Sequence, residues 1–467
     1  MKEVFIEKSH KLLRIAIKEN NTLVYCRFYE EDNKPKVGEI YLGVIKKIVP
    51  AMKCAFIDLG CDRNAYLDLD KHKAKIKNGD EILVEVLKEE IGDKGAKVTS
   101  KVTMGGDYLI VGDFGTGIRM SKSIEDNEFI KEVKKKIKAP KDMAVTIRTK
   151  AVEKTIGFIE GEMELLSNNF REIKKRGTFT KGPKILYKPE KALREVLLDL
   201  DIDDRVYCND KDELEDINKI ISDLHKRKDG YIGIVSSLHE GDINLFHYYG
   251  LDNEILSLRN RKIELKSKGC IILDKTEAMN VIDVNSGNSI EGIDVEENIL
   301  KINLEAATEI CKQIQLRDLS GIIVIDFIDV FNEKQKNEII KTLKLGLKND
   351  RNKIKVYDFT ELSLVQITRE RRGKSILEYI EEEVGNQFYS IKAVKKDYLK
   401  FLIKNELLRV CRGSCFENLE VHINKIYYFD LRDNIEDLES YMANKNLCIK
   451  VVFDDIELFS VNPAIFN

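Results

Sequence analysis

The amino-acid sequence predicts an α+β protein made of several domains, and two regions of the chain carry most of that prediction. Residues 37–103 contain several short strand-like runs separated by Gly, Asp and Asn, a pattern typical of a five-stranded barrel of the OB type. Residues 262–370 alternate strand-like and helix-like runs, which is typical of an α/β domain. The chain has 467 residues, and since domains are commonly about 100–200 residues long, it has room for three or four such units.

The remaining segments are assigned in chain order from their periodicity and turn residues. Residues 1–35 favour a β-hairpin, because LLRIAI and TLVYCRF are strand-like and Asn20-Asn21 can form the turn between them. Residues 104–185 mix short strands with a charged helix, and residues 187–230 are mostly helical. Residues 374–467 begin with a helix and continue with short mixed elements.

The composition is that of a folded protein rather than of a disordered or secreted one. Hydrophobic residues make up 43% of the chain and charged residues 34%. No apolar run approaches the ~20 residues of a membrane-spanning helix, and the N-terminus lacks the features of a secretion signal. The nine cysteines are odd in number, irregularly spaced and without a C-x-x-C, which favours free thiols in a reducing compartment. Together these features predict a cytoplasmic protein.

The charge of the chain gives only a weak indication of nucleic-acid binding. The net charge of −3 does not by itself mark a nucleic-acid-binding protein, but phosphate binding depends on the local field. Two basic runs stand out: Lys131–Lys141 (KEVKKKIKAPK), at the end of a helix predicted over 127–138, and Arg171–Arg176 (REIKKR). Taken alone, each run is more typical of a solvated helix face than of a binding surface.

The most informative segment carries acidic residues near the ends of two predicted strands. In TEAMNVIDVNSG, period-2 alternation places Asp283 and Asn285 on one face of a strand. A helix follows, and the next strand, GIIVIDFIDV, is apolar until Asp326 and Asp329. A strand, a crossover helix and a second strand normally give neighbouring parallel strands, so Asp283 and Asp326 are expected to meet in space.

Two carboxylates and an amide at the carboxyl ends of neighbouring strands indicate a Mg²⁺ site, because Mg²⁺ prefers oxygen ligands. Without a cation the carboxylates would repel each other, whereas bound Mg²⁺ could polarise a phosphate oxygen and lower the pKa of an attacking water. The alternative is that these aspartates only cap strand ends. The pattern alone leaves the two interpretations equally open.

At the level of whole motifs, this region resembles the catalytic domain of the ribonuclease E/G family. The resemblance rests on TEAMNVIDVNSG, NLEAATEI and QLRDLSGIIVIDFIDV, and it continues through LKNDRNKIKV to LVQITRERRGKSI. It implies a DNase I-like catalytic domain in which Asp283 and Asp326 bind Mg²⁺ and Asn285 positions one of them, so that all three are candidate catalytic residues. Asp329 is a weaker candidate, either auxiliary to the site or structural.

An upstream segment, GEIYLGVIKKIVPAMKCAFIDLGCDRNAYLDL, is similar to the S1 domain of the same family. S1 domains are OB-folds, which bind single strands by stacking bases on aromatic side chains within a positive groove. The resemblance places Phe56 and Tyr66 at the RNA-stacking positions. Without this resemblance, an aromatic side chain on a barrel strand would more commonly belong to the core. For Tyr41 the choice between the barrel core and an RNA-stacking position stays open.

A third segment, TIRTKAVEK, resembles the part of the family that grips a 5′-monophosphate. It implies Arg148 and Thr149 as 5′-phosphate-binding residues, with Lys353 in NDRNKIKV as a further basic residue. The chemistry is suitable, because Arg offers a planar fork to phosphate and Thr adds a hydroxyl donor. An ordinary exposed Arg remains the alternative.

The resemblance also implies how the chain divides into domains. The N-terminal hairpin is expected to join a later segment in an RNase H-like subdomain, into which the S1 barrel is inserted. The expected divisions are an RNase H-like subdomain (1–36 and 187–261), an S1/OB-fold domain (37–103), a 5′-phosphate sensor region (104–186), a DNase I-like catalytic domain (262–385) and a small C-terminal domain (386–467).

The sequence departs from the pattern of the family at the zinc-binding motif. Where the family commonly has C-P-x-C-x-G, this chain has KSILEYIEEEVGNQFYS, and the later CRGSC does not match. Structural zinc and a zinc-linked tetramer are therefore not expected, while a homodimer and a monomer both stay open.

The expected function is a Mg²⁺-dependent endoribonuclease that cuts single-stranded RNA, favours 5′-monophosphorylated ends and acts in mRNA decay or rRNA processing. The alternatives are a noncatalytic S1-type RNA-binding scaffold and a DNA-directed nuclease.

Overall fold

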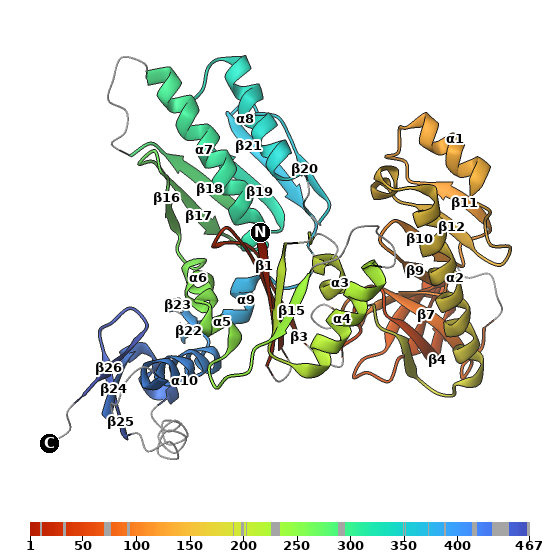
Figure 1. Cartoon of the computed structure of the whole chain (residues 1–467), viewed down its shortest axis with the longest axis horizontal. Helices are drawn as coiled ribbons and strands as arrows, with labels where there is room; N and C mark the ends of the chain where they lie inside the picture. The colour runs from red at the N-terminus through yellow and green to blue at the C-terminus, as the bar shows by residue number, and fades with distance from the viewer. Residues whose placement is uncertain are drawn as a thin grey trace. The chain divides into compact units, whose positions relative to one another are not determined.

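The computed structural model of the chain divides into two compact units (Figure 1). The larger unit comprises residues 1–30, 203–216 and 233–467, and the smaller unit comprises residues 31–202 and 217–232. The structure describes residues 1–9, 12–30, 34–69, 76–90, 94–189, 191–197, 200–201, 203–225, 234–287, 295–348, 350, 352–371, 373–386, 389–412, 418–431 and 448–464.

The predicted barrel is present in the smaller unit. Its five strands run in the order β4-β5-β6-β8-β7, and β4 also pairs with β7, which closes the barrel. A sixth strand, β13 (Lys184–Tyr187), pairs with the first half of β4. Alternate side chains such as Ile57, Leu67 and Val84 fill the interior. The barrel strands are β4 (Ile40–Val49), β5 (Cys54–Asp58), β6 (Ala65–Asp68), β7 (Glu81–Lys88) and β8 (Lys97–Thr99).

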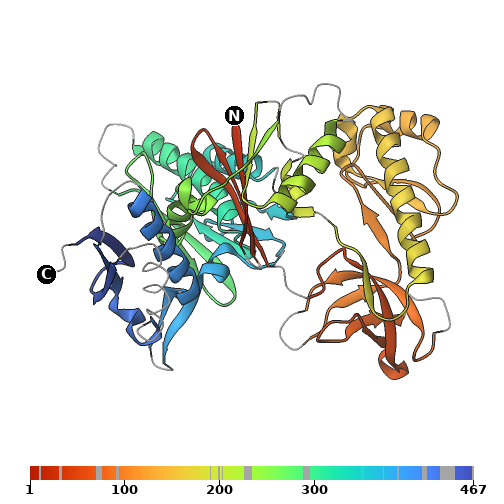
Figure 2. The ribbon, with the colours of Figure 1, turned by 60° about the horizontal axis from the view of Figure 1, so that its bottom comes forward.

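A second sheet in the smaller unit has the order β11-β12-β10-β9. The 24-residue helix α2 (Ile156–Phe179) packs on it through Ile159 and Phe170, and Figure 2 shows this gold helix running from the sheet to the barrel. The charged helix predicted over 127–138 is α1, which spans Asn127–Lys136. The other elements here are β9 (Thr103–Gly105), β10 (Leu109–Gly112), β11 (Gly117–Met120), β12 (Ala144–Ile147) and α3 (Lys191–Leu197).

The larger unit begins with a five-stranded sheet in the order β15-β14-β1-β2-β3. The predicted hairpin is β2–β3, and Asn20 and Asn21 turn the chain with positive φ values of 50° and 63°. The sequence reading missed β1 and also β14, which lies in a stretch expected to be mostly helical. The elements are β1 (Lys2–Ser9), β2 (Leu12–Glu19), β3 (Thr22–Glu30), β14 (Arg205–Cys208), β15 (Val235–Leu238), α5 (Leu245–Tyr248) and α6 (Leu251–Ser257). Helix α4 (Lys211–His225) begins in the larger unit, and its residues from 217 onward belong to the smaller unit.

The second sheet of the larger unit has the order β16-β17-β18-β19-β21-β20, and α7 and α8 lie on one of its faces (Figure 1). The predicted strand–helix–strand pattern is β18–α7–β19; the short strands β16 and β20 were not anticipated. The elements are β16 (Lys262–Glu264), β17 (Cys270–Lys275), β18 (Met279–Asn285), α7 (Val295–Leu316), β19 (Gly321–Asp326), α8 (Glu333–Gly346), β20 (Ile354–Val356) and β21 (Leu364–Arg369).

The C-terminal part of the larger unit contains a hairpin, β22–β23, and a three-stranded sheet in the order β25-β24-β26. Helix α10 packs on this sheet through Ile403 and Leu407. Of the CRGSC segment, only Cys411 and Arg412 lie within the described residues. The elements are α9 (Ile376–Ile380), β22 (Glu381–Asn386), β23 (Tyr389–Val394), α10 (Lys396–Arg412), β24 (Asn418–Asn424), α11 (Tyr428–Leu431), β25 (Cys448–Asp454) and β26 (Phe459–Pro463).

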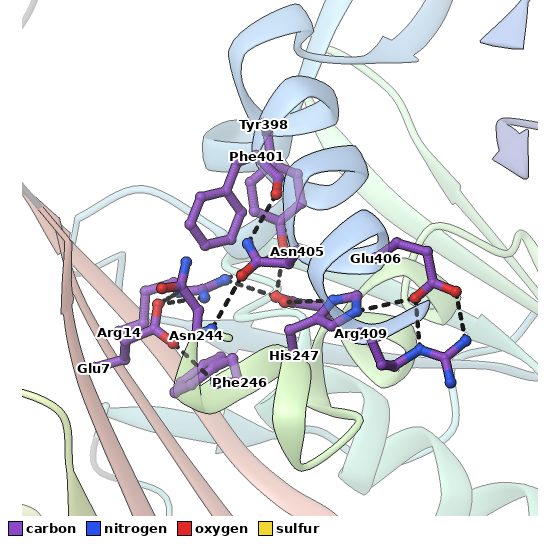
Figure 3. Close-up of polar contacts among 11 residues, drawn as sticks. Glu7, Arg14, Asn244, Phe246, His247, Tyr398, Phe401, Asn405, Glu406 and Arg409 are labelled. Atoms are coloured by element: carbon purple, nitrogen blue, oxygen red, sulfur yellow. Dashed lines mark hydrogen bonds and ion pairs between the residues drawn. The ribbon is translucent and has the colours of Figure 1, made fainter. Parts of the chain in front are cut away.

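A buried polar cluster joins the first sheet of the larger unit to α5, α6 and α10 (Figure 3). The Arg14 guanidinium, which is 1% exposed, donates to Glu7 Oε1 at 2.5 Å and to Asp252 Oδ1 at 2.7 Å. Phe246 lies under it, with the ring centroid 4.3 Å from Cζ. Tyr398, on α10, donates its hydroxyl to the same Asp252 oxygen. Each buried charge is thus paired and hydrogen-bonded, as burial of charge requires.

Candidate active site

Asp283 and Asp326 lie side by side on neighbouring strands. β18 and β19 pair in parallel with Asp283 in register with Asp326, as the strand–helix–strand pattern predicted. Neighbouring strands are about 4.8 Å apart, and residues in register project from the same face of the sheet. The two carboxylates therefore share one face near the C-terminal ends of both strands.

Burial of the opposite face explains why the aspartates point this way. Ile282, Ile323 and Ile325 are fully buried against α7. Because side chains alternate along a strand, burying these residues directs the aspartates to the other face. There Asp283 is half-buried and Asp326 is exposed, so the pair is accessible to a substrate.

Two further polar residues, Asn285 and Asp329, influence the Asp283–Asp326 pair. Asn285 lies two residues beyond Asp283, and its Nδ2 donates a 2.7 Å hydrogen bond to Asp283 Oδ2. The pKa of Asp326 is raised above its usual range, first by partial desolvation and then by the negative charges of Asp283 and Asp329. Asp329 thus contributes to an acidic site without pairing in the strands.

Asn303, on α7, is a residue of this site that the sequence reading missed. It is fully buried, its Nδ2 donates to the carbonyl oxygen of Ile328 at 2.8 Å, and its Oδ1 accepts from the Ile328 N–H at 3.2 Å. Ile328 lies in the segment between Asp326 and Asp329, so Asn303 holds that segment from behind. The available signal was an amide within the apolar face of the NLEAATEI helix.

The donor set fits a hydrated Mg²⁺ ion better than a fully protein-bound metal. Among the described residues, no group of three or more His, Cys, Asp or Glu side chains is placed to hold a metal together. Mg²⁺ commonly takes one or two carboxylates and keeps several waters, which matches Asp283 and Asp326. The repulsion that raises the pKa of Asp326 is also what a bound cation would relieve.

The two predicted stacking residues lie together on the outside of the barrel. Phe56 on β5 is paired with Tyr66 on β6, and their rings meet edge to face with centroids 6.4 Å apart. Both are half-buried, so neither belongs wholly to the core. Lys47 is the cross-strand partner of Phe56, and Lys97 places its Nζ 5.7 Å from the centroid of the Tyr66 ring. A row of two cations and two aromatic rings results.

Tyr41, which the sequence left undecided, belongs to the barrel interior. It is 6% exposed and its hydroxyl donates to Glu39 Oε2 at 2.7 Å. Burial, together with the nearby Glu39, raises the pKa of the phenol. Its ring is therefore not available for stacking.

Arg148 and Thr149 lie next to each other where β12 ends, and both are exposed. The Arg148 guanidinium lies over Gly105, where a β-carbon would come within 2.9 Å of Nη2. The Thr149 hydroxyl is 3.3 Å from Ser121 Oγ. Within the described part of the chain, Arg148 forms no ion pair. Lys353, also exposed, belongs to the larger unit.

Comparison with known proteins shows which family the chain belongs to. Residues 103–372, more than half of the chain, match the model of the ribonuclease E/G family. The chain is 30% identical over 387 residues to a putative ribonuclease E of Buchnera aphidicola subsp. Baizongia pistaciae, which covers 78% of this chain and 94% of that protein. It is similarly 30% identical to ribonuclease E of Escherichia coli K12, over 78% of this chain, and 28% identical to ribonuclease G of Haemophilus influenzae, over 78% of each chain.

The chain therefore belongs to the ribonuclease E/G family. Its match spans only 36% of the length of the Escherichia coli ribonuclease E and 57% of a ribonuclease E from a Nostoc species. None of the helices within the described residues is both long enough and apolar enough to cross a membrane.

Proposed function

We propose that the protein is a metal-dependent endoribonuclease that cleaves single-stranded RNA, with Asp283, Asn285 and Asp326 as its catalytic residues. The observation that carries the proposal is the register of Asp283 with Asp326 on a parallel strand pair. Membership of a family whose relatives are named ribonuclease E and ribonuclease G supports the same assignment.

In this proposal Asp283 and Asp326 hold Mg²⁺, which when bound polarises the scissile phosphate and lowers the pKa of an attacking water. Asn285 orients Asp283 through the 2.7 Å hydrogen bond between their side chains. Asn303 is a positioning residue, because it fixes the backbone between Asp326 and Asp329. Hydrolysis leaves a 3′-hydroxyl and a 5′-phosphate on the products.

The barrel is assigned the role of gripping unpaired nucleotides. Phe56 and Tyr66 offer ring surfaces on which bases can stack, and stacking of this kind tolerates different sequences because every base has a π-face. Lys47 and Lys97, beside the rings, are placed to contact the backbone phosphates. This row of residues favours single-stranded over double-stranded RNA, whose bases are already stacked and paired.

A 5′-monophosphate is assigned to Arg148 and Thr149. An exposed guanidinium without an acidic partner within the described residues can form two parallel hydrogen bonds to phosphate oxygens, and the Thr hydroxyl can add another. Lys353, in the larger unit, stays a separate proposed phosphate-binding residue. Preference for a 5′-monophosphate suits an enzyme that acts in mRNA decay or rRNA maturation in the cytoplasm.

The strand orders support the finer fold assignments. The order β15-β14-β1-β2-β3, in which β1, β2 and β3 are antiparallel and β14 and β15 are parallel to β1, supports an RNase H-like subdomain. The mixed six-stranded sheet with α7 and α8 on one face supports a DNase I-like catalytic domain. The proposed divisions remain 1–36 with 187–261, 37–103, 104–186, 262–385 and 386–467.

Cleavage of a short unpaired RNA with a 5′-monophosphate tests the proposal. Wild type should cut it with Mg²⁺ and not with a chelator, whereas Asp283→Asn and Asp326→Asn should bind the RNA without cutting it. Asp274→Asn is the matched control, because Asp274 is exposed on the neighbouring strand β17 and paired with Arg261. If the active-site variants cut like wild type, the site assignment is wrong. If wild type binds but never cuts, the protein is an RNA-binding scaffold, and equal cleavage of matched single-stranded DNA would remove the RNA specificity.

A further inference from the structure

Positive charge is concentrated in one part of an otherwise acidic chain. Residues 131–184 contain 15 Lys and Arg residues against 7 Asp and Glu residues, which leaves a net charge of +8. The whole chain carries −3, so the other residues together carry −11. A segment that departs this far from the rest of the chain creates a local field suited to a polyanion.

This charge lies on the outer faces of α1 and α2, in the smaller unit. On α1, Phe129 and Val133 are buried, while the lysines on the other side are exposed. A bidentate ion pair between Arg171 on α2 and Asp142, with distances of 2.8 and 2.9 Å, joins the segment after α1 to α2. We call six exposed cations on α1, on the segment after it and on α2 the α1–α2 basic surface: Lys134, Lys135, Lys138, Lys141, Lys175 and Arg176.

Three of the nearby carboxylates are already paired with other cations. Glu132 is bound by Lys136, Asp142 by Arg171 and Asp113 by Lys174. Within the described residues, none of the six cations of the α1–α2 basic surface forms an ion pair. Interaction with the helix dipole explains basic residues in the last turn of α1, but not Lys138 and Lys141, which lie beyond the end of that helix.

An exposed aromatic side chain adjoins the same surface. Phe179, the last residue of α2, is 80% exposed and follows Lys175 and Arg176 by less than two turns. This end of α2 lies against the barrel, since a β-carbon at Gly177 would contact Leu186 and Leu83 at 3.5 Å. Phe179 is therefore presented from a packed part of the fold. Aromatic rings among unpaired cations are typical of surfaces that bind single-stranded nucleic acid.

From these observations we infer that the α1–α2 basic surface and Phe179 form a second RNA-binding surface, separate from the Phe56–Tyr66 row and from Arg148. Its cations hold backbone phosphates and Phe179 stacks on a base, so it grips nucleotides beyond those at the cleavage site. This inference rests on the proposed function in taking RNA as the ligand. An anionic membrane fits less well, because the apolar face of α1 is buried in the core and cannot enter a bilayer.

Salt-dependent RNA binding tests the electrostatic part. The variant Lys134→Gln/Lys135→Gln/Lys175→Gln/Arg176→Gln is compared with its parent, both carrying Asp326→Asn to prevent cleavage. The probe is a fluorescent, unstructured A/U RNA of about 20 nucleotides with a 5′-hydroxyl. Each phosphate contact on single-stranded nucleic acid contributes about 0.7 to the slope of log K against log salt, so losing four contacts should lower the slope by about 3. The affinity at about 100 mM salt should fall at least tenfold.

Two comparisons separate this role from general effects of charge or folding. The variant Lys211→Gln/Lys425→Gln/Lys450→Gln removes three exposed cations that are already paired with carboxylates, and it should leave the affinity and the slope nearly unchanged. Phe179→Ala should weaken binding at least fivefold, and Phe179→Trp should restore it, because a larger ring still stacks. Far-UV circular dichroism confirms that each variant is folded.

The outcomes are distinct. If the quadruple variant binds the RNA with the affinity and slope of its parent, the second surface does not exist. Binding to vesicles rich in anionic lipid is measured as well. If the quadruple variant loses binding to these vesicles but not to RNA, the surface binds a membrane and the assignment of RNA as its ligand is overturned. Cleavage of a 5′-monophosphorylated RNA by wild type is measured alongside. If the wild type fails to cleave this RNA while the quadruple variant still loses RNA binding, the proposed enzymatic function is wrong and the second RNA-binding surface is supported.

Discussion

Replacing Arg14 with Met should be among the most destabilising single substitutions in the larger unit. Arg14 is 1% exposed and neutralises Glu7 and Asp252, which are themselves buried. Burial raises the pKa of Asp252, but the charges of Arg14 and His247 and the hydrogen bonds from them together outweigh this effect and lower the pKa. Removing Arg14 leaves the buried Glu7 without its cation and leaves Asp252 with only His247, whose Nδ1 lies 3.6 Å from Asp252 Oδ2. Breaking a buried pair in this way costs about 3–5 kcal/mol. That is a large fraction of the ~5–15 kcal/mol that stabilises a typical domain.

Urea unfolding followed by far-UV circular dichroism measures this cost, since the chain has no Trp for fluorescence. The triple variant Glu7→Gln/Arg14→Met/Asp252→Asn should recover much of the loss, because no unpaired charge then remains buried. Arg261→Met is the matched control, since Arg261 forms a bidentate pair with Asp274 at the surface and its loss should barely move the midpoint. A loss below about 1 kcal/mol for Arg14→Met would refute the reasoning.

Four other substitutions follow from the same structure. Asn303→Leu should lower cleavage at least tenfold with little change in RNA binding, because the backbone beyond Asp326 loses two hydrogen bonds; unchanged single-turnover rates would contradict this. Phe56→Ala should weaken binding of unpaired RNA by about 1–3 kcal/mol, measured by fluorescence anisotropy, while Phe56→Trp should not. In chelator, Asp326→Asn should raise the urea midpoint, because it removes carboxylate repulsion; a lower midpoint would argue against an acidic site. His247 has a pKa raised to about 9, since hydrogen bonds and charges from two carboxylates outweigh its burial. Its stabilising effect is therefore complete below about pH 6.5 and lost as the pH rises through 9, so His247→Gln should flatten that part of the stability profile.

The elements nearest the site could be predicted because their signals are local. The alternation of VIDVN and the apolar run GIIVID reveal two strands, and the helix between them implies their parallel pairing. The same holds for the barrel, where short strands alternate with Gly and Asn. The positions of Asp283 and Asp326 on one face therefore followed from the sequence.

Other features depend on partners that are distant in the chain and so left no local signal. Arg14 and Asp252 are 238 residues apart, and neither residue indicates the other. Strand β1 carries four consecutive buried residues, Val4, Phe5, Ile6 and Glu7, so it lacks the alternation by which half-buried strands are recognised. Strand β20 has only three residues, too few for any periodicity to be read.

The site depends above all on the register of β18 against β19. A slip of one residue would move Asp326 to the face where Ile325 now lies and would separate it from Asp283. Two features at the start of β19 oppose such a slip. Asp318 and Gly321, in the turn after α7, have φ values of 54° and 85°, and the Asp318 carboxylate accepts a 2.5 Å hydrogen bond from Arg369 at the end of β21. At the other end of β19, Asn303 on α7 forms two hydrogen bonds with Ile328, just beyond the strand. Helix α7 therefore both precedes β19 in the chain and fixes the segment that follows it. The chemistry proposed for two surface carboxylates is therefore set by buried contacts at both ends of one strand.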